Sequence, residues 1–134
     1  MTYKCYFLLF LSLIFVSCFE DKQIFVNCSN PELDYTGRVH FLDNEVAEIF
    51  WTGTSIKMNF EGESVSATLK DETGKNYYNV IVNNKLETII KPDTLKKTYT
   101  LASNLPKGKH RVELFKRNDW NRGKTQFFGF KINN

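Results

Sequence analysis

Apolar and polar side chains alternate with a period of two near the end of the chain. One face of the segment 109–116 takes every second residue, namely His110, Val112, Leu114 and Lys116. This alternation is typical of a β-strand with one buried face. A polar loop centred on Trp120 and Gly123 follows, and Phe127–Ile132 is then almost purely apolar, which predicts a second, buried strand. Two such strands need a sheet to pack against.

Shorter segments with strand-like patterns recur earlier in the chain. They cover residues 35–41, 49–51, 55–60, 65–69, 77–82, 86–91 and 97–102. The turn at residues 61–63 predicts a hairpin between the third and fourth, and Asn83 and Asn84, which tolerate positive φ, predict one between the fifth and sixth. All these segments make about nine short strands at a spacing of roughly 8 to 12 residues. The pattern predicts an all-β fold, an antiparallel β-sandwich or jelly roll.

The first residues differ from the rest. Residues 7–16 are nearly all apolar and follow the single cation Lys4. A run of this length is too short for a permanent transmembrane helix, which needs about 20 residues. We therefore predict a secretory signal peptide over residues 1–17.

The end of this segment resembles a bacterial lipobox, in which a small residue precedes a cysteine that is acylated. Phe15, Val16 and Ser17 precede Cys18, with Phe15 at the position where leucine is usual, and ordinary cleavage is the alternative. The resemblance predicts lipidation at Cys18 and a membrane anchor, because several acyl chains give stable attachment. We expect a lipid-anchored or secreted protein of the bacterial cell envelope. Residues 18–30 would form an irregular tether, and residues 31–134 the folded domain.

Composition narrows the possible functions. The 134 residues suffice for one domain, and the aromatic content of 15% supplies a core. The formal charge of +3, from 18 basic and 15 acidic residues, is too small to indicate nucleic-acid binding. With Cys5 in the signal peptide and Cys18 acylated, Cys28 has no partner for an intramolecular disulfide, and we expect it to be structural.

The sequence offers little catalytic chemistry. A serine hydrolase needs a base beside its nucleophile, but His40 and His110 lie within strand patterns, and no Gly-x-Ser-x-Gly or Gly-Asp-Ser turn accompanies them. Both histidines are interpreted as structural. No histidine or cysteine pair has the spacing of zinc ligands, and Asp43, Glu45 and Glu48 do not form a calcium-loop motif. We expect no metal, no cofactor and no enzymatic activity of this chain alone.

The two tryptophans are the candidate binding residues. An exposed indole on a β-sandwich can stack on a sugar ring, and loops often carry binding residues. Trp51 follows Ile49 and Phe50, which favours a core position over a stacking role. For Trp120, in a polar loop, both roles stay open. The remaining candidates, which could add hydrogen bonds to a carbohydrate or contact another domain, are Arg117, Asn118 and Asn121.

Several motifs together resemble the N-terminal jelly-roll domain of carbohydrate esterase family 2. They are Tyr35-Thr-Gly-Arg38, Phe50-Trp51-Thr-Gly53-Thr-Ser55, Asn76-Tyr77-Tyr78-Asn79-Val80, the segment Gly108–Arg117, and Phe127-Phe-Gly129-Phe130. The resemblance covers residues 30–132. It implies an accessory role in the deacetylation of plant-type polysaccharides such as acetylxylan.

In that family the β-domain precedes an SGNH-type hydrolase domain, which supplies a serine nucleophile and a histidine base. The sequence ends at Asn134, where that domain would begin, and no position here matches a catalytic residue. The resemblance therefore implies a non-catalytic β-domain with a polysaccharide or an SGNH hydrolase domain as its partner. The alternatives are a stand-alone carbohydrate-binding lipoprotein and a docking module for a separately encoded hydrolase.

Overall fold

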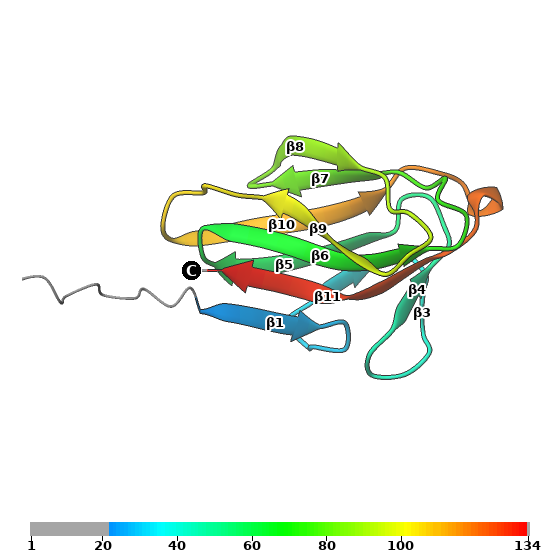
Figure 1. The fold of residues 1–134 in the computed structure, drawn as a ribbon, viewed down its shortest axis with the longest axis horizontal. Coiled ribbons are helices and arrows are strands. Elements are labelled where there is room, and N and C mark those ends of the chain that lie inside the picture. Colours follow the sequence, from blue (N-terminus) through cyan, green and yellow to red (C-terminus); the bar gives the residue numbers. More distant parts are fainter. Residues whose placement is uncertain (1–21, 134) are drawn as a thin grey trace, which may run out of the picture.

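The computed structural model describes residues 22–133 and shows two antiparallel sheets packed face to face (Figure 1). One sheet has the order β2 (Asp34–Thr36), β5 (Ser55–Glu61), β10 (Lys109–Lys116), β7 (Tyr78–Val82) and β8 (Lys85–Ile90). The other has the order β3 (Val39–Phe41), β4 (Ala47–Ile49), β11 (Thr125–Asn133), β6 (Ser64–Asp71) and β9 (Lys97–Ala102), and β1 (Gln23–Asn27) also pairs with β11. A short 3-10 helix, η1 (Trp120–Arg122), connects β10 to β11. The prediction of an all-β antiparallel sandwich is confirmed.

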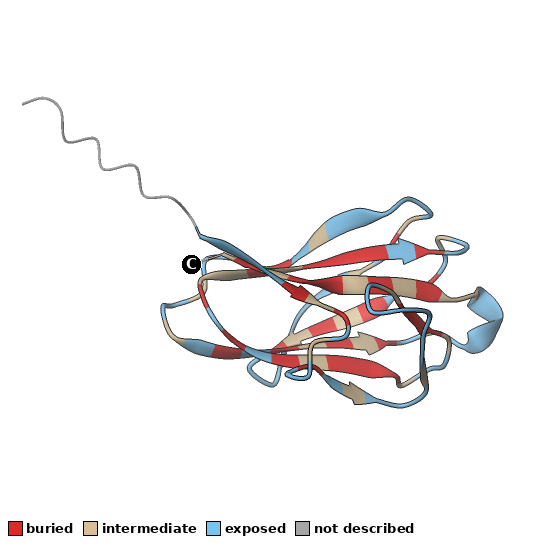
Figure 2. Ribbon diagram, turned by 90° about the horizontal axis from the view of Figure 1, so that it is seen from below, coloured by how far each residue is buried: buried red, intermediate tan, exposed pale blue. Residues whose placement is uncertain are grey.

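The core lies between the sheets and is filled by alternate residues of their strands (Figure 2). On β10, the four residues that the pattern placed on one face are all buried. The inward residues of β5 and β6 are also those predicted: Ile56, Met58, Phe60, Val65, Ala67 and Leu69. Because burying apolar side chains is the main favourable contribution to folding, this shared core holds the two sheets together.

The described residues form eleven strands, more than the pattern predicted. The segment 35–41 is interrupted at Gly37, whose φ is +96° and where a Cβ would lie 2.9 Å from Thr54 Oγ1. Residues 23–27, assigned to an irregular tether, form β1, because their backbone pairs with β11 although the segment is mostly exposed. The tether prediction is wrong for these residues. The signal peptide of residues 1–17 and the acylated Cys18 lie outside the described residues.

One predicted hairpin is confirmed and the other is wrong. β7 and β8 pair through a turn in which Asn83 and Asn84 have φ of 50° and 65°. β5 and β6 do not pair, because β5 lies between β2 and β10 while β6 lies between β11 and β9. The turn at residues 61–63 therefore passes from one sheet to the other. Each strand presents one apolar face to the core in either arrangement, so the local pattern does not distinguish them.

β11 is paired along both edges. β6 pairs with one edge along its whole length, and the other edge pairs first with β4 and then with β1. The β6 register shifts between Phe127 and Gly129, which marks a β-bulge. Gly129 has φ of +151°, and a Cβ there would lie 2.3 Å from the Val26 carbonyl oxygen. The close approach of β1 therefore requires glycine at this position.

Glu48 of β4 is buried and lies beside three side chains. Lys124 Nζ is 2.7 Å from Glu48 Oε1, Gln126 Nε2 is 3.3 Å from the same oxygen, and His40 Nδ1 is 3.4 Å from Oε2. Burial raises the pKa of Glu48, but the hydrogen bonds from Lys124, Gln126 and His40 outweigh it and hold the pKa below its ordinary value. The carboxylate thus connects β4 to β11 and its preceding loop.

We predict that Gly129→Ala lowers the free energy of unfolding by about 2–4 kcal/mol, through backbone strain and collision with β1. Urea unfolding measures this loss. Gly108→Ala is the matched control, since Gly108 has φ of +134° but nothing within 4 Å of a Cβ. A loss at residue 129 no larger than that at residue 108 would contradict the close packing against β1.

We also predict that Glu48 contributes to acid sensitivity. Because the pKa of Glu48 is lowered in the folded state, its contribution is present above the unfolded-state pKa and is lost as pH falls through the folded-state pKa. Glu48→Gln should therefore flatten the acid side of the curve of unfolding free energy against pH. The exposed Glu87→Gln serves as the control. A Glu48→Gln curve parallel to that of the wild type would disprove this role.

Candidate functional site

The two tryptophans lie together on the surface. Trp51 is in the loop between β4 and β5, and Trp120 begins η1. Their ring centroids are 6.4 Å apart with an angle of 45° between the ring planes. Trp51 is 45% exposed and Trp120 63% exposed, so the core position favoured for Trp51 is wrong. Figure 1 shows η1 at the end of the sandwich remote from the C-terminus. We call these two side chains the tryptophan pair.

Polar contacts surround the tryptophan pair. Thr52 Oγ1 donates to Asp119 Oδ1 at 2.8 Å, which connects the two loops beside the rings. The guanidinium carbon of Arg38 lies 5.9 Å from the centroid of the Trp51 ring, a distance typical of a cation–π contact. Arg38 was not among the candidate residues, because it lies in the connection between β2 and β3, apart from both loops in sequence.

Of the other candidates, two have exposed side chains and one has its side chain in a hydrogen bond within the protein. Arg117 and Asn121 are exposed near Trp120. Asn118 Oδ1 accepts a hydrogen bond from the Tyr77 backbone N–H, and the Arg117 N–H donates to the Tyr77 carbonyl oxygen at 3.0 Å. Asn118 therefore fixes the loop against the segment before β7. Arg117 and Asn121 are the side chains better placed to reach a ligand at the tryptophan pair.

A buried carboxylate organises the loops beneath η1. Asp71 Oδ1 accepts hydrogen bonds from the backbone N–H groups of residues 73–75, at 3.1, 2.7 and 3.3 Å. Asp71 Oδ2 accepts from Asn76 Nδ2 at 2.8 Å and from Thr125 Oγ1 at 2.6 Å. A carboxylate satisfied by so many donors is a strong and directional link between segments. The turn-like composition at residues 71–74 hinted at the local bonds, but the contact with Thr125 spans 54 positions.

This cluster also contacts η1. Asn76 Nδ2 lies 3.2 Å from the carbonyl oxygens of both Arg122 and Gly123, and Thr73 Oγ1 donates to the Arg122 carbonyl oxygen at 2.5 Å. Carbonyl groups at the end of a helix have no partner within the helix, so these bonds satisfy them. The position of η1, and of Trp120 within it, is therefore set by the loop between β6 and β7.

Lys116 reaches the same region from β10 and is fully buried. Burial lowers the pKa of its ammonium, and the charges of Asp71 and Asp119 oppose this effect in part. A buried lysine without hydrogen-bond acceptors is costly. Its partners are two backbone carbonyl oxygens of the tryptophan loops.

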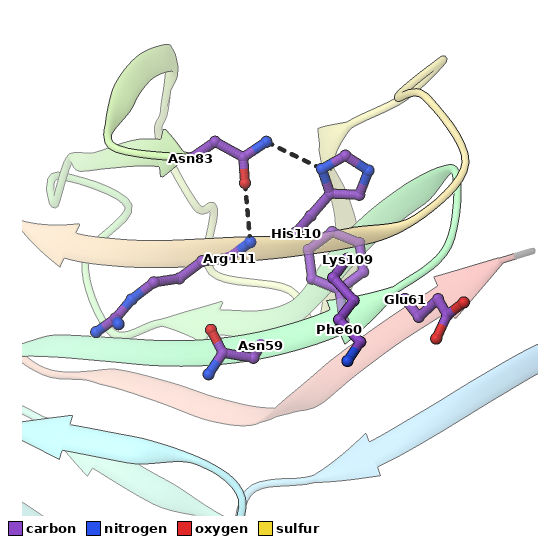
Figure 3. A pocket seen from close by; sticks show the side chains of 7 residues that line it. All are labelled: Asn59, Phe60, Glu61, Asn83, Lys109, His110 and Arg111. Atoms are coloured by element: carbon purple, nitrogen blue, oxygen red, sulfur yellow. Dashed lines mark hydrogen bonds between the residues drawn. The ribbon is translucent and has the colours of Figure 1, made fainter.

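A pocket lies toward the other end of β10 (Figure 3). Its lining consists of Asn59, Phe60, Glu61, Asn83, Lys109, His110 and Arg111. His110 Nδ1 is 2.9 Å from Asn83 Nδ2, and its Nε2 is 2.6 Å from the Pro106 carbonyl oxygen. Both ring nitrogens therefore have partners, as a structural histidine requires. The aromatic ring in this pocket, Phe60, is itself buried and offers no stacking surface.

Within residues 22–133, the cysteine, histidine and acidic side chains form no metal site. Cys28 is buried and free, with Sγ 3.6 Å from the Asn44 carbonyl oxygen, and burial is the main cause that raises the pKa of its thiol. No group of three or more histidine, cysteine or acidic side chains in this range is arranged to hold a metal ion. In the same range, no helix has the length and apolar character needed to cross a bilayer.

Comparisons with known proteins identify relatives of this chain. The family described as "Carbohydrate esterase 2 N-terminal" matches residues 35–134. The Cellulase/esterase CelE of Acetivibrio thermocellus is 33% identical over 83% of the chain, which corresponds to 13% of that protein. The chain thus spans about an eighth of the length of this relative.

Two solved structures share the fold. A family two carbohydrate esterase from Cellvibrio japonicus matches with a TM-score of 0.79 and 24% identity, over 85% of this chain and 34% of that one. A family two carbohydrate esterase from Clostridium thermocellum, in complex with cellohexaose, matches with a TM-score of 0.69 and 32% identity, over 73% of this chain and 30% of that one.

We predict that Asp71→Asn destabilises the fold by about 2–4 kcal/mol, because an amide turns an N–H₂ group toward donors and removes a buried charged acceptor. Urea unfolding measures the loss. Asp34→Asn, on the exposed face of β2, is the control and should change stability little. Equal unfolding free energies for the two variants would show that the Asp71 cluster does not organise these loops.

Proposed function

The chain belongs to the carbohydrate esterase 2 N-terminal family, and on that basis we propose that it is a non-catalytic β-domain that contacts polysaccharide as an accessory to an acetyl esterase. The tryptophan pair carries this proposal. Two large indoles remain exposed at one end of the sandwich and share a single surface. Exposed aromatic side chains gathered in this way are typical of a binding surface.

The geometry suits a carbohydrate ligand. Sugar rings present apolar C–H faces that stack on indoles, and hydroxyl groups that need hydrogen-bond partners at the edges. The two ring planes, tilted by 45°, offer separate faces to successive sugar units of a twisted chain. Arg117 and Asn121 are exposed beside Trp120 and can supply the hydrogen bonds. The esterase from Clostridium thermocellum was solved with cellohexaose, which supports a β-linked glucan or a related backbone as the ligand class.

We place the protein at a bacterial cell envelope. The apolar segment 7–16 and the lipobox-like residues before Cys18 support export and acylation. The N-terminal acyl chains would anchor the domain. β1 begins at Gln23, so few residues separate the anchor from the fold, and the domain would lie close to the membrane surface.

A second candidate function is docking of a hydrolase domain, and the edge strand β8 favours it. Leu86 is 60% exposed and Ile89 44% exposed, and they lie opposite Ile81 and Asn79 of β7. This apolar strip is separate from the tryptophan pair. The relatives are several times longer than the matched region, which fits a hydrolase domain as the partner of this strip.

We predict that Trp120→Ala weakens binding to soluble glucomannan or acetylated xylan by about 2 kcal/mol, or roughly thirtyfold, because truncating a central aromatic contact removes most of its binding energy. Affinity electrophoresis in gels that contain the polysaccharide measures this loss. Trp51→Ala should also weaken binding, through loss of the second indole.

Leu86→Ala is the matched control, since Leu86 is 60% exposed and Trp120 63% exposed. It should leave retention unchanged. Wild-type protein that is not retarded by any of these polysaccharides, or Trp120→Ala protein retarded as strongly as the wild type, would refute carbohydrate binding at this surface. Weakened retention of the Leu86→Ala protein would indicate that the polysaccharide binds at β8.

A further inference from the structure

Lys116 is a charged side chain with no solvent exposure, at the end of the central strand β10. Lysine is almost never fully buried unless it is paired, because removing an ammonium from water is costly. It is also the last of the four inward residues of β10, where the three before it contact the core. A position in this row needs an aliphatic stem, but it does not need a charge.

The ammonium group lies between the two tryptophan loops. Lys116 Nζ donates to the Phe50 carbonyl oxygen at 2.7 Å and lies 3.4 Å from the Gly123 carbonyl oxygen. Phe50 directly precedes Trp51, and Gly123 directly follows the helix that Trp120 begins. One side chain therefore contacts the backbone next to both members of the tryptophan pair.

Each loop has a separate attachment to the sandwich. The Lys116 N–H donates to the Thr54 carbonyl oxygen at 2.9 Å, and the Gly53 N–H donates to the Lys116 carbonyl oxygen at 3.0 Å. These bonds fix the Trp51 loop to β10, while the Asp71 cluster fixes η1 to β6. The exposed bond between Thr52 and Asp119 links the loops at the surface, where water competes for both groups. The buried link between them is the Lys116 side chain.

We propose that Lys116 is a positioning residue whose buried ammonium, held between the carbonyl oxygens of Phe50 and Gly123, sets the separation and tilt of the tryptophan pair. Charge-assisted hydrogen bonds are shorter and stronger than neutral ones. The ammonium therefore holds the Phe50 carbonyl group at 2.7 Å and attracts the Gly123 carbonyl group at 3.4 Å, whereas an apolar side chain would only fill space. Burial lowers the pKa of the Lys116 ammonium, and the negative charges of Asp71 and Asp119 offset part of this effect. The consequence for ligand binding rests on the proposed function, but the geometry of the pair does not.

Circular dichroism reports the separation and angle of the two indoles, and it needs no ligand. The chain has two tryptophans, and both are in the pair. Two indoles this close and not coplanar give an exciton couplet, whose amplitude depends steeply on their separation and angle. Trp120→Phe removes one indole and defines the signal without a pair.

The decisive variant is Lys116→Met, which keeps an unbranched apolar stem as far as the ε position and removes the ammonium. We expect its couplet to fall to the Trp120→Phe level while the β-sheet spectrum is retained. Leu114→Ala is the control for lost packing, because Leu114 is buried on the same face of β10 but is not bonded to either loop. Its couplet should match that of the wild type. A wild-type couplet in Lys116→Met protein would overturn the proposal.

A measurement on the wild-type protein decides the matter if Lys116→Met does not fold. The Lys116 ammonium, shielded from water, should give an observable ¹⁵Nζ proton signal. Nuclear Overhauser contacts from Lys116 to both Phe50 and Gly123 would support the bridge. Contacts to one loop alone, or rapid exchange of the ammonium protons with water, would overturn it.

Polysaccharide retention separates this inference from the proposed function. If the wild type binds no polysaccharide, the proposed function fails, while the couplet still tests the role of Lys116. If the wild type binds, Lys116→Met should lose retention together with its couplet, and Leu114→Ala should lose neither. Full retention by Lys116→Met protein that has lost its couplet would refute the link between pair geometry and binding.

Discussion

Pairing along both edges of β11 is the constraint on which the rest of the fold depends. β6 occupies one edge, and β4 and β1 share the other, so three strands of the sheet are placed by a single partner. The bulge near Gly129 falls between the β4 and β1 pairings and allows β1 to approach closely. Because β11 begins shortly after η1, its register also determines where Trp120 meets the end of the sandwich.

The loop end of the sandwich buries the opposite charges of Asp71 and Lys116, and both are hydrogen-bonded to backbone groups of the loops. Asp71 accepts from three consecutive N–H groups, and Lys116 donates toward two carbonyl groups. Desolvating charged groups in a core is costly, so such groups often add little to stability compared with well-packed apolar residues. Here the two charges contribute directional hydrogen bonds. Each charge reaches segments that are far apart in sequence and holds them in one arrangement.

The sequence predicts most of the strands, because strand formation in a sandwich depends on the local alternation of apolar and polar residues. The buried face of β10, the β7–β8 turn and the range of β9 all follow from neighbouring residues. What the sequence could not show was which strands pair. β5 and β6 alternate like a hairpin but belong to different sheets, and β1 is a strand because β11 is beside it.

The same limit applies to the candidate site. Trp120 was recognisable as a loop residue, but Trp51 follows two apolar residues that favour a buried position. It lies at a turn that includes Gly53, with φ of +80°, and Lys116 donates a hydrogen bond to the carbonyl oxygen of the residue before it. The Asp71–Thr125 bond joins residues 54 positions apart, and no sequence pattern marks it. Contacts of this kind depend on the tertiary fold.

Under the proposed function, the tryptophan pair would benefit from the rigidity of the backbone that carries it. An exposed indole contributes little to stability, and a mobile one loses conformational entropy when it binds a ligand. Here the backbone beside both indoles is hydrogen-bonded to the side chains of Lys116, Thr73 and Asn76, so the backbone part of that entropy is lost on folding instead of on binding. Preorganisation of this kind increases affinity without any additional contact. Under the same proposal, it would account for the buried charges of Asp71 and Lys116 at the end of the sandwich that carries the exposed tryptophans.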